Sequence, residues 1–368
     1  MLARGRRGVP DRTDALSALH DARTREVQLM STSRLSSLAA TLALVVTLVA
    51  TIPGQTAAQA ATRGGSVASA ALPASYRLFL DEVGGSHFVS VRGSRLHYVE
   101  MGDAARPTLL LVHGSPDNAY TWRNIMPILA TRYHVVAVDL LGFGRSGQPA
   151  VRYGWKIEIS YLSVFISTLN LRHVTLVATD IGALFSFAYA QQHPGNVAGI
   201  AFWETFVQPI PSYASLAYCG ACAAFFPRDP APNLAYARKD PQFIAQAYSQ
   251  SLLSPPTPDV LAAYAFPFTT PTAREIPIKV GSDMPIGGRP AATYPIIASY
   301  ARYLRTTTTP KLALYGTPGY VLPRSVLARW SPGVPNLTLA SAGRGYHYLS
   351  EDQPGPIAQA ILAWRATF

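Results

Sequence analysis

The order of apolar and polar positions along the chain predicts a parallel β-sheet interleaved with helices. Nearly continuous apolar runs that end in turn residues are typical of strands buried on both faces. Such runs lie at 108–112, 134–138, 174–178, 197–202, 310–315 and 337–340. Helix-like stretches lie between them at 157–169 and 184–193, and a further one ends the chain at 355–368. An alternating pattern at 88–91 and 96–100 predicts an antiparallel hairpin around Gly93. Strands that alternate with helices indicate an α/β fold with a mostly parallel sheet and flanking helices.

This alternation stops between residues 205 and 309. The segment is rich in Pro, Tyr and Ala, and it contains helix-like pieces at 241–253 and 293–304 but no clear strand. We expect a helical lid over 205–309, inserted into a core that is formed by residues 85–204 and 310–368. Ligands of open α/β sheets bind at the carboxyl ends of the strands. A lid inserted at this point is therefore expected to cover the substrate site.

The first sixty residues have the organisation of a secretory signal peptide. An apolar run from Leu38 to Ile52 is followed by Ala58-Gln-Ala60, which matches a small-residue cleavage site. The run is short for a membrane span, so we expect cleavage near Ala60, export, and no stable span in the mature protein. The Arg-rich stretch ahead of the signal makes Met30 the expected start of translation. A linker is expected over 61–84, and its first part, to about residue 75, is rich in Gly, Ser and Ala.

Composition and charge indicate which kinds of molecule the protein binds. The chain has 368 residues, of which 49% are hydrophobic and 14% charged, enough apolar material for a large buried core. Its net charge of +11 comes mainly from arginines scattered singly along the chain, without the long basic runs of nucleic-acid-binding segments. We therefore expect no nucleic-acid partner. We also expect a small-molecule substrate and a monomeric protein.

The two cysteines, Cys219 and Cys222, form a C-x-x-C pair. In an exported protein this spacing predicts a small local disulfide or two buried apolar side chains. The same spacing suits redox or metal chemistry, but the chain has no second cysteine pair to complete a metal site.

Three polar residues follow the ends of predicted strands. Asp180 stands between a strand and a helix in Val-Ala-Thr-Asp-Ile-Gly, the position of a nucleophile elbow. Glu204 ends the next strand, and His347 follows the last one. A carboxylate can attack an sp³ carbon to give an ester, and histidine can then activate water against that ester. A second acid would orient the imidazole. The sequence thus predicts catalysis by these residues, whereas Asp139, also at a strand end, is expected to order the neighbouring Gly142-x-Gly144 turn.

Several stretches resemble the haloalkane dehalogenase branch of the α/β-hydrolase superfamily, over residues 85–368. They are 113–125 (HGSPDNAYTWRNI), 139–146 (DLLGFGRS), 204–211 (ETFVQPIP), 316–319 (GTPG) and 347–354 (HYLSEDQP). The resemblance implies an α/β-hydrolase fold, Asp180 as nucleophile, His347 as base and Glu204 as the orienting acid. The alternative acid position of this superfamily falls in GTPG, which has no carboxylate. No metal or organic cofactor is implied.

The resemblance is incomplete where such enzymes hold the leaving halide. They use two side-chain N–H donors, a Trp directly after the nucleophile and usually an Asn directly after His-Gly. This chain has Ile181 and Ser115 there. Loss of one such donor can lower a rate by about 10²–10³-fold. The backbone N–H groups of both residues remain available as an oxyanion hole. Trp203 is a possible replacement donor, although core packing is the role that we favour for it.

The altered leaving-group site leaves three interpretations open. We expect a hydrolase that acts on a small or medium hydrophobic substrate through an alkyl-enzyme ester. The first alternative is an epoxide hydrolase, whose leaving alkoxide is protonated by lid tyrosines. The candidate donors are Tyr213, Tyr218, Tyr236, Tyr248, Tyr264, Tyr294, Tyr300 and Tyr303. The second is a non-dehalogenating relative, either a cofactor-free oxygenase-like enzyme or a ligand-binding protein.

Overall fold

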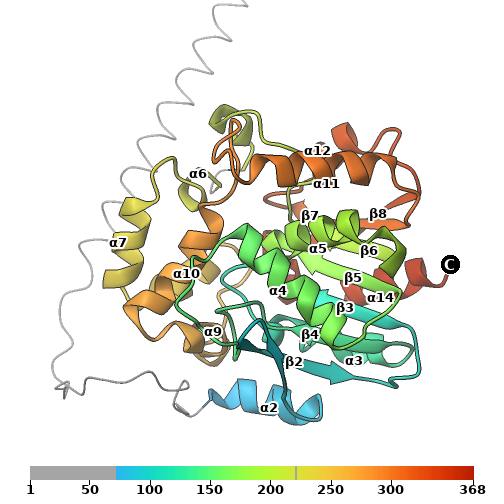
Figure 1. Cartoon of the computed structure of the whole chain (residues 1–368), viewed down its shortest axis with the longest axis horizontal. Helices are drawn as coiled ribbons and strands as arrows, with labels where there is room; N and C mark the ends of the chain where they lie inside the picture. Colours follow the sequence, from blue (N-terminus) through green and yellow to red (C-terminus); the bar gives the residue numbers. More distant parts are fainter. Residues whose placement is uncertain (1–71, 220–221) are drawn as a thin grey trace, which may run out of the picture. The chain divides into compact units, whose positions relative to one another are not determined.

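The computed structural model of the chain describes residues 72–219 and 222–368 (Figure 1). The predicted signal peptide, its cleavage near Ala60, the start at Met30 and the first part of the predicted linker lie outside the described residues. No helix within the described residues is both long enough and apolar enough to cross a membrane.

Eight strands of the described residues form one sheet in the order β1-β2-β4-β3-β5-β6-β7-β8. The pairs β1·β2 and β2·β4 are antiparallel, and every other neighbouring pair is parallel. The predicted hairpin is confirmed, and its two-residue turn uses Arg92 and Gly93, both at positive φ. The strands are β1 (His87–Val91), β2 (Ser94–Met101), β3 (Thr108–Val112), β4 (His134–Val138), β5 (Val174–Thr179), β6 (Val197–Trp203), β7 (Lys311–Pro318) and β8 (Leu337–Gly345).

Burial explains why the central strands are continuous apolar runs. Every residue of β4 and β5 is buried, because helices cover the sheet on both faces. Figure 1 shows α4 (Trp155–Thr168) and α5 (Asp180–Gln192) over one face, while α14 (Pro354–Arg365) packs with α3 (Met126–Ala130) on the other. The predicted α/β-hydrolase fold is confirmed. The helix α12 (Arg324–Trp330) packs on β7.

The linker prediction is wrong for its second half. Residues Ala74–Glu82 form helix α2, in which Tyr76, Phe79 and Leu80 are buried. Their i, i+3, i+4 spacing places them on one face of the helix. That face packs against the rest of the molecule, and the Tyr76 ring contacts Phe266 with ring centroids 4.8 Å apart.

The predicted lid is helical, but its boundary lies earlier than residue 309. Helix α11 (Tyr294–Thr306) packs on α5, with the rings of Tyr300 and Phe187 5.4 Å apart. It therefore covers the sheet and belongs to the core. The lid helices are α6 (Cys222–Phe225), α7 (Ala231–Lys239), α8 (Phe243–Ser249), α9 (Pro258–Ala265) and α10 (Pro271–Gly281).

Candidate active site

The backbone at the end of β5 raises the Asp180 side chain above the sheet. Asp180 has a φ of 50°, a left-handed conformation that a non-glycine residue rarely adopts. Such strain costs about 1–3 kcal/mol and is concentrated at functional sites. A Cβ atom on Gly182 would collide with the backbone carbonyl of His113, and one on Gly114 would lie 2.6 Å from Asp180 Cβ. The two glycines allow this close approach of the chain.

The Asp180 carboxylate is held by backbone N–H groups. The N–H of Ser115 donates to Oδ1 at 2.9 Å, and the N–H of Ile181 also donates to the carboxylate. The side chain lies at the N-terminus of α5, where the helix dipole favours a negative charge. Burial nevertheless raises the pKa of Asp180, against the opposing influence of His347 and the two N–H donors.

His347 lies between two carboxylates. Its Nε2 is 3.6 Å from Oδ2 of Asp180, and its Nδ1 is 3.4 Å from Oε2 of Glu204. Burial by itself would lower the pKa of His347, but the hydrogen bond to Glu204 and the charges of both carboxylates raise it overall. The lid also supports this loop, because the backbone N–H of His347 donates to the carbonyl of Ser251 at 3.2 Å. The structure thus brings together the three residues that the sequence singled out.

Glu204 is buried, and the loop after β7 supports its carboxylate. Backbone N–H groups donate to it from Tyr320 at 3.1 Å and from Val321 at 2.7 Å. Gly319 precedes them at positive φ, and a Cβ there would lie 3.1 Å from Oε1 of Glu204. The loop that directly follows the GTPG segment, which lacks an acid, therefore contributes donors to Glu204, a role that no sequence pattern indicated.

A largely apolar cavity lies above Asp180, with core residues on one side and lid residues on the other. Its lining includes Ser115 and Ile181, the two residues expected from the sequence at the leaving-group site. The predicted local disulfide between Cys219 and Cys222 is confirmed, and both cysteines line this cavity. Further lining residues are Pro116, Phe225, Phe226, Phe243, Ala247, Pro277, Ile278, Gly281, Tyr320, Val321 and Tyr348.

The structure decides between the alternatives left open for a leaving-group donor. Trp203 does not line the cavity; its fully buried indole packs edge-to-face on Trp122, with ring centroids 5.7 Å apart. Core packing is thus its role, as the sequence favoured. Of the eight lid tyrosines proposed as donors, none lines the cavity in the described part of the chain. Some are buried and others, such as Tyr236 and Tyr294, are exposed. The cavity tyrosines are Tyr320 and Tyr348, which come from loops outside the lid.

Asp139 has the structural role expected of it. Its carboxylate contacts Nδ1 of His97 at 2.6 Å and accepts the N–H groups of Ala119 and Arg145 at 2.7 and 2.8 Å. A Cβ on Gly144 would collide with the carboxylate. Burial would raise the pKa of Asp139, but His97 and the N–H donors lower it overall. The partner His97 gave no signal in the sequence.

Sequence reasoning also missed two residues next to the site. The hydroxyl of Thr205 donates to the Asp180 carbonyl at 2.8 Å and so supports the strained turn. Asp117, two residues after Ser115, is almost fully buried, and burial raises its pKa to about 7. Its only sequence signal was an acidic residue inside the HGSPD stretch. No group of three His, Cys, Asp or Glu side chains suited to a metal ion occurs among the described residues.

Comparisons with known proteins agree with this geometry. A family described as alpha/beta hydrolase fold matches residues 107–218. The chain is 34% identical over 278 residues to a haloalkane dehalogenase of Mesorhizobium japonicum, covering 75% of this chain and 89% of that protein. A haloalkane dehalogenase of Agrobacterium fabrum is 32% identical over 274 residues, covering 74% of this chain and 88% of that protein.

Solved structures lead to the same family. The crystal structure of haloalkane dehalogenase DbeA from Bradyrhizobium elkani has a TM-score of 0.73 and 31% identity, covering 77% of this chain and 98% of that one. DatA from Agrobacterium tumefaciens has a TM-score of 0.70 and 30% identity, with coverage of 77% and 96%. Similarity over nearly the whole length of these relatives shows that the chain is an α/β-fold hydrolase and belongs to the haloalkane dehalogenase family.

Proposed function

We propose that this chain hydrolyses a small or medium apolar substrate through attack of the Asp180 carboxylate on an sp³ carbon. The observation that carries the proposal is the way the two carboxylate oxygens are held. The N–H of Ser115 binds Oδ1 at 2.9 Å, while Oδ2 lies on the side of His347, whose Nε2 is 3.6 Å away. One oxygen is thus held by a backbone N–H group, and the other lies near the imidazole of His347, which also lines the cavity.

In the first step, one oxygen of Asp180 forms a bond to the substrate carbon, and the bond from carbon to the leaving group breaks. The product is an alkyl ester on Asp180. Burial raises the pKa of Asp180 because the buried carboxylate is poorly solvated. Ester formation removes this buried negative charge, which favours the step.

In the second step, His347 removes a proton from water, and the hydroxide attacks the ester carbonyl. Before the reaction, the charge of Asp180 helps to raise the pKa of His347. The ester is neutral, so alkylation removes this influence and favours the neutral imidazole that a general base requires. The backbone N–H groups of Ser115 and Ile181 stabilise the oxyanion, and Glu204 holds the imidazole.

A haloalkane is the first substrate class that we propose, since the relatives named above are haloalkane dehalogenases. The aromatic and aliphatic lining of the cavity suits an apolar chain. An epoxide is the second class. It is favoured by the absence of a side-chain donor at Ile181 together with the presence of tyrosines in the cavity lining. Halide release measured against diol formation separates the two classes.

Trapping the ester tests the proposal directly. His347→Ala removes the base, so an alkyl-enzyme ester should accumulate during incubation with a panel of alkyl halides and epoxides. Intact-protein mass spectrometry should show the added mass, and peptide mapping should locate it on Asp180. The double variant Asp180→Ala/His347→Ala is the matched control and should gain no mass. If no member of the panel labels His347→Ala, the mechanism is wrong, and an oxygenase-like or ligand-binding function becomes the better account.

We also propose that the mature protein is exported. The apolar run that ends before Ala60 and the disulfide between Cys219 and Cys222 support this, because disulfides persist in oxidising compartments. Peptide mapping of the native protein tests the location and the processing site together. A mature N-terminus near Ala61 is expected, whereas an intact N-terminus on cytosolic protein would contradict export.

A further inference from the structure

Two tyrosines of the described residues, Tyr320 and Tyr348, line the cavity, and the charge of Asp180 acts on the pKa of Tyr348 but not of Tyr320. Tyr348 follows His347 directly and is 6% exposed. Burial raises its pKa well above the usual value, and the charges of Asp117 and Asp180 raise it further. For Tyr320 the corresponding influences, after burial, are Tyr346 and Glu204. Tyr348 is therefore the cavity tyrosine that lies within electrostatic range of the reacting carboxylate.

The Tyr348 hydroxyl has no hydrogen-bond partner among the described residues. Buried side-chain donors in folded proteins are nearly always paired with protein groups or with water. An unpaired hydroxyl on a residue that lines a substrate cavity is available to a ligand. A tyrosine hydroxyl carries its proton at neutral pH, so it can donate, and burial favours this protonated form further.

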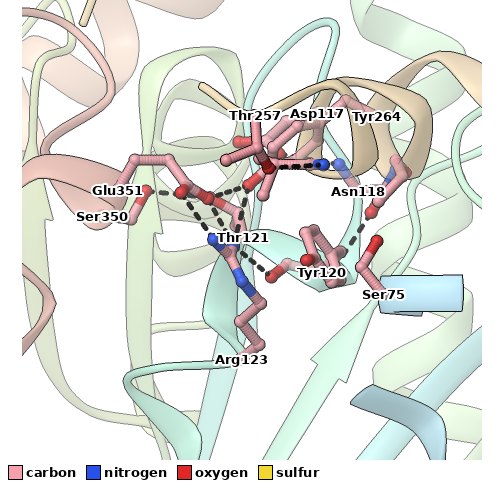
Figure 2. A network of polar contacts seen from close by, with 12 residues as sticks. Ser75, Asp117, Asn118, Tyr120, Thr121, Arg123, Thr257, Tyr264, Ser350 and Glu351 are labelled. Atoms are coloured by element: carbon pink, nitrogen blue, oxygen red, sulfur yellow. Dashed lines mark hydrogen bonds and ion pairs between the residues drawn. The ribbon is translucent and has the colours of Figure 1, made fainter. Parts of the chain in front are cut away.

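Aromatic stacking fixes the Tyr348 ring. Tyr248 of lid helix α8 stacks on it at a centroid distance of 4.1 Å, and Tyr264 of α9 stacks on Tyr248 at 4.2 Å. The hydroxyl of Tyr264 donates to Glu351, which also forms a bidentate ion pair with Arg123 (Figure 2). Tyr264, the last ring of the stack, is thus hydrogen-bonded through Glu351 to the core. A donor held in this way stabilises developing charge without having to reorganise during the reaction.

We propose that the Tyr348 hydroxyl is the leaving-group donor of this site, in place of the side-chain N–H that Ile181 cannot provide. The inference rests on the proposed function, because it assigns a role in the step in which Asp180 is alkylated. A tyrosine in this place serves leaving groups of two kinds, a halide or an epoxide oxygen.

The two kinds differ in the fate of the Tyr348 proton. When the carbon–halogen bond breaks, the electron pair leaves with the halide; the hydroxyl donates a hydrogen bond and keeps its proton. When an epoxide carbon–oxygen bond breaks, the oxygen keeps the pair and takes the Tyr348 proton. Hydrolysis of the ester by water regenerates Asp180 as a carboxylic acid. Its proton is released as acid in the halide case and returns to the Tyr348 phenolate in the epoxide case.

The test measures alkylation alone, in the full-length His347→Ala protein. The added ester mass is followed over time with an alkyl bromide, an alkyl chloride and an epoxide of equal chain length. Adding Tyr348→Phe should slow ester formation by roughly 10²-fold. The loss should be larger for the chloride than for the bromide and largest for the epoxide, since poorer leaving groups depend more on a donor. Tyr348→Phe removes only an unpaired oxygen and keeps the stacked ring, so folding should be preserved.

The matched control is Tyr346→Phe in the same background. Tyr346 lies on the same loop, on the other side of His347, and does not line the cavity. This variant should form the ester at the parent rate. If Tyr348→Phe also reacts at the parent rate, or if Tyr320→Phe causes the loss instead, the inference is overturned while the proposed function stands. If His347→Ala itself forms no ester with any probe, both are overturned.

Discussion

Oε2 of Glu204 lies 3.4 Å from Nδ1 of His347 and accepts the N–H of Val321 at 2.7 Å. The carboxylate that contacts the histidine is thus held by the backbone of a loop that follows a different strand. Both oxygens of Glu204 accept N–H groups from this loop. The position of the imidazole therefore depends on an acid that cannot easily move.

Replacing Glu204 with Gln should slow ester hydrolysis more than ester formation. A neutral amide no longer stabilises the imidazolium that forms when His347 takes a proton from water. We expect the hydrolysis rate to fall by about 10²–10⁴-fold. Rapid-quench mass spectrometry in a single turnover separates the two steps, and the ester should accumulate. Glu100→Gln, a partly exposed glutamate on β2, is the control. Equal slowing of both steps would contradict the orienting role.

Restoring the two side-chain N–H donors should favour halide as a leaving group. In Ser115→Asn/Ile181→Trp, the new amide and indole would face the cavity, since both residues line it. Each donor can contribute about 10²-fold to such a step. Halide release should rise relative to epoxide hydrolysis, measured with matched substrates. Because Ile181 is 2% exposed, the melting temperature must be checked for overpacking. A stable variant without added halide release would mean that cavity shape decides the chemistry.

Asp117 should make the free energy of unfolding fall as the pH rises. Burial raises the pKa of Asp117 from 3.8 to about 7 in the folded protein. Between these values the folded state binds more protons than the unfolded state, so stability decreases with pH across this window and is lowest above it. Asp117→Asn removes the ionisable group and should therefore stabilise the protein more at about pH 8 than at about pH 5. Thermal melts at both pH values measure this.

The exposed Asp81 provides the control for that experiment. Asp81→Asn should shift the melting temperature equally at both pH values, because no buried carboxyl is removed. If Asp117→Asn behaves in the same way, Asp117 is ionised in the folded protein across this range, and its burial does not penalise the charge as argued.

Prediction from sequence worked where the physical signal is local. The buried strands β4 and β5 are continuous apolar runs, and the Asp180-Ile-Gly elbow needs a small residue at a fixed offset. Helix α2 was missed because it is short and follows directly on a stretch of linker-like composition. Helix α11 was assigned to the lid because an amphipathic helix has the same pattern whether it packs on a sheet or on other lid helices.

The sequence by itself determined the sheet, the order of its elements and the three polar residues at strand ends, because periodicity and turn chemistry depend only on neighbouring positions. The tertiary structure alone decided which side chains meet above Asp180. Trp203 packs in the core. Among the described residues, Tyr348 lines the cavity and the eight lid tyrosines do not. These outcomes depend on how distant elements pack, and packing joins residues such as Tyr248 and Tyr348 that no local pattern relates.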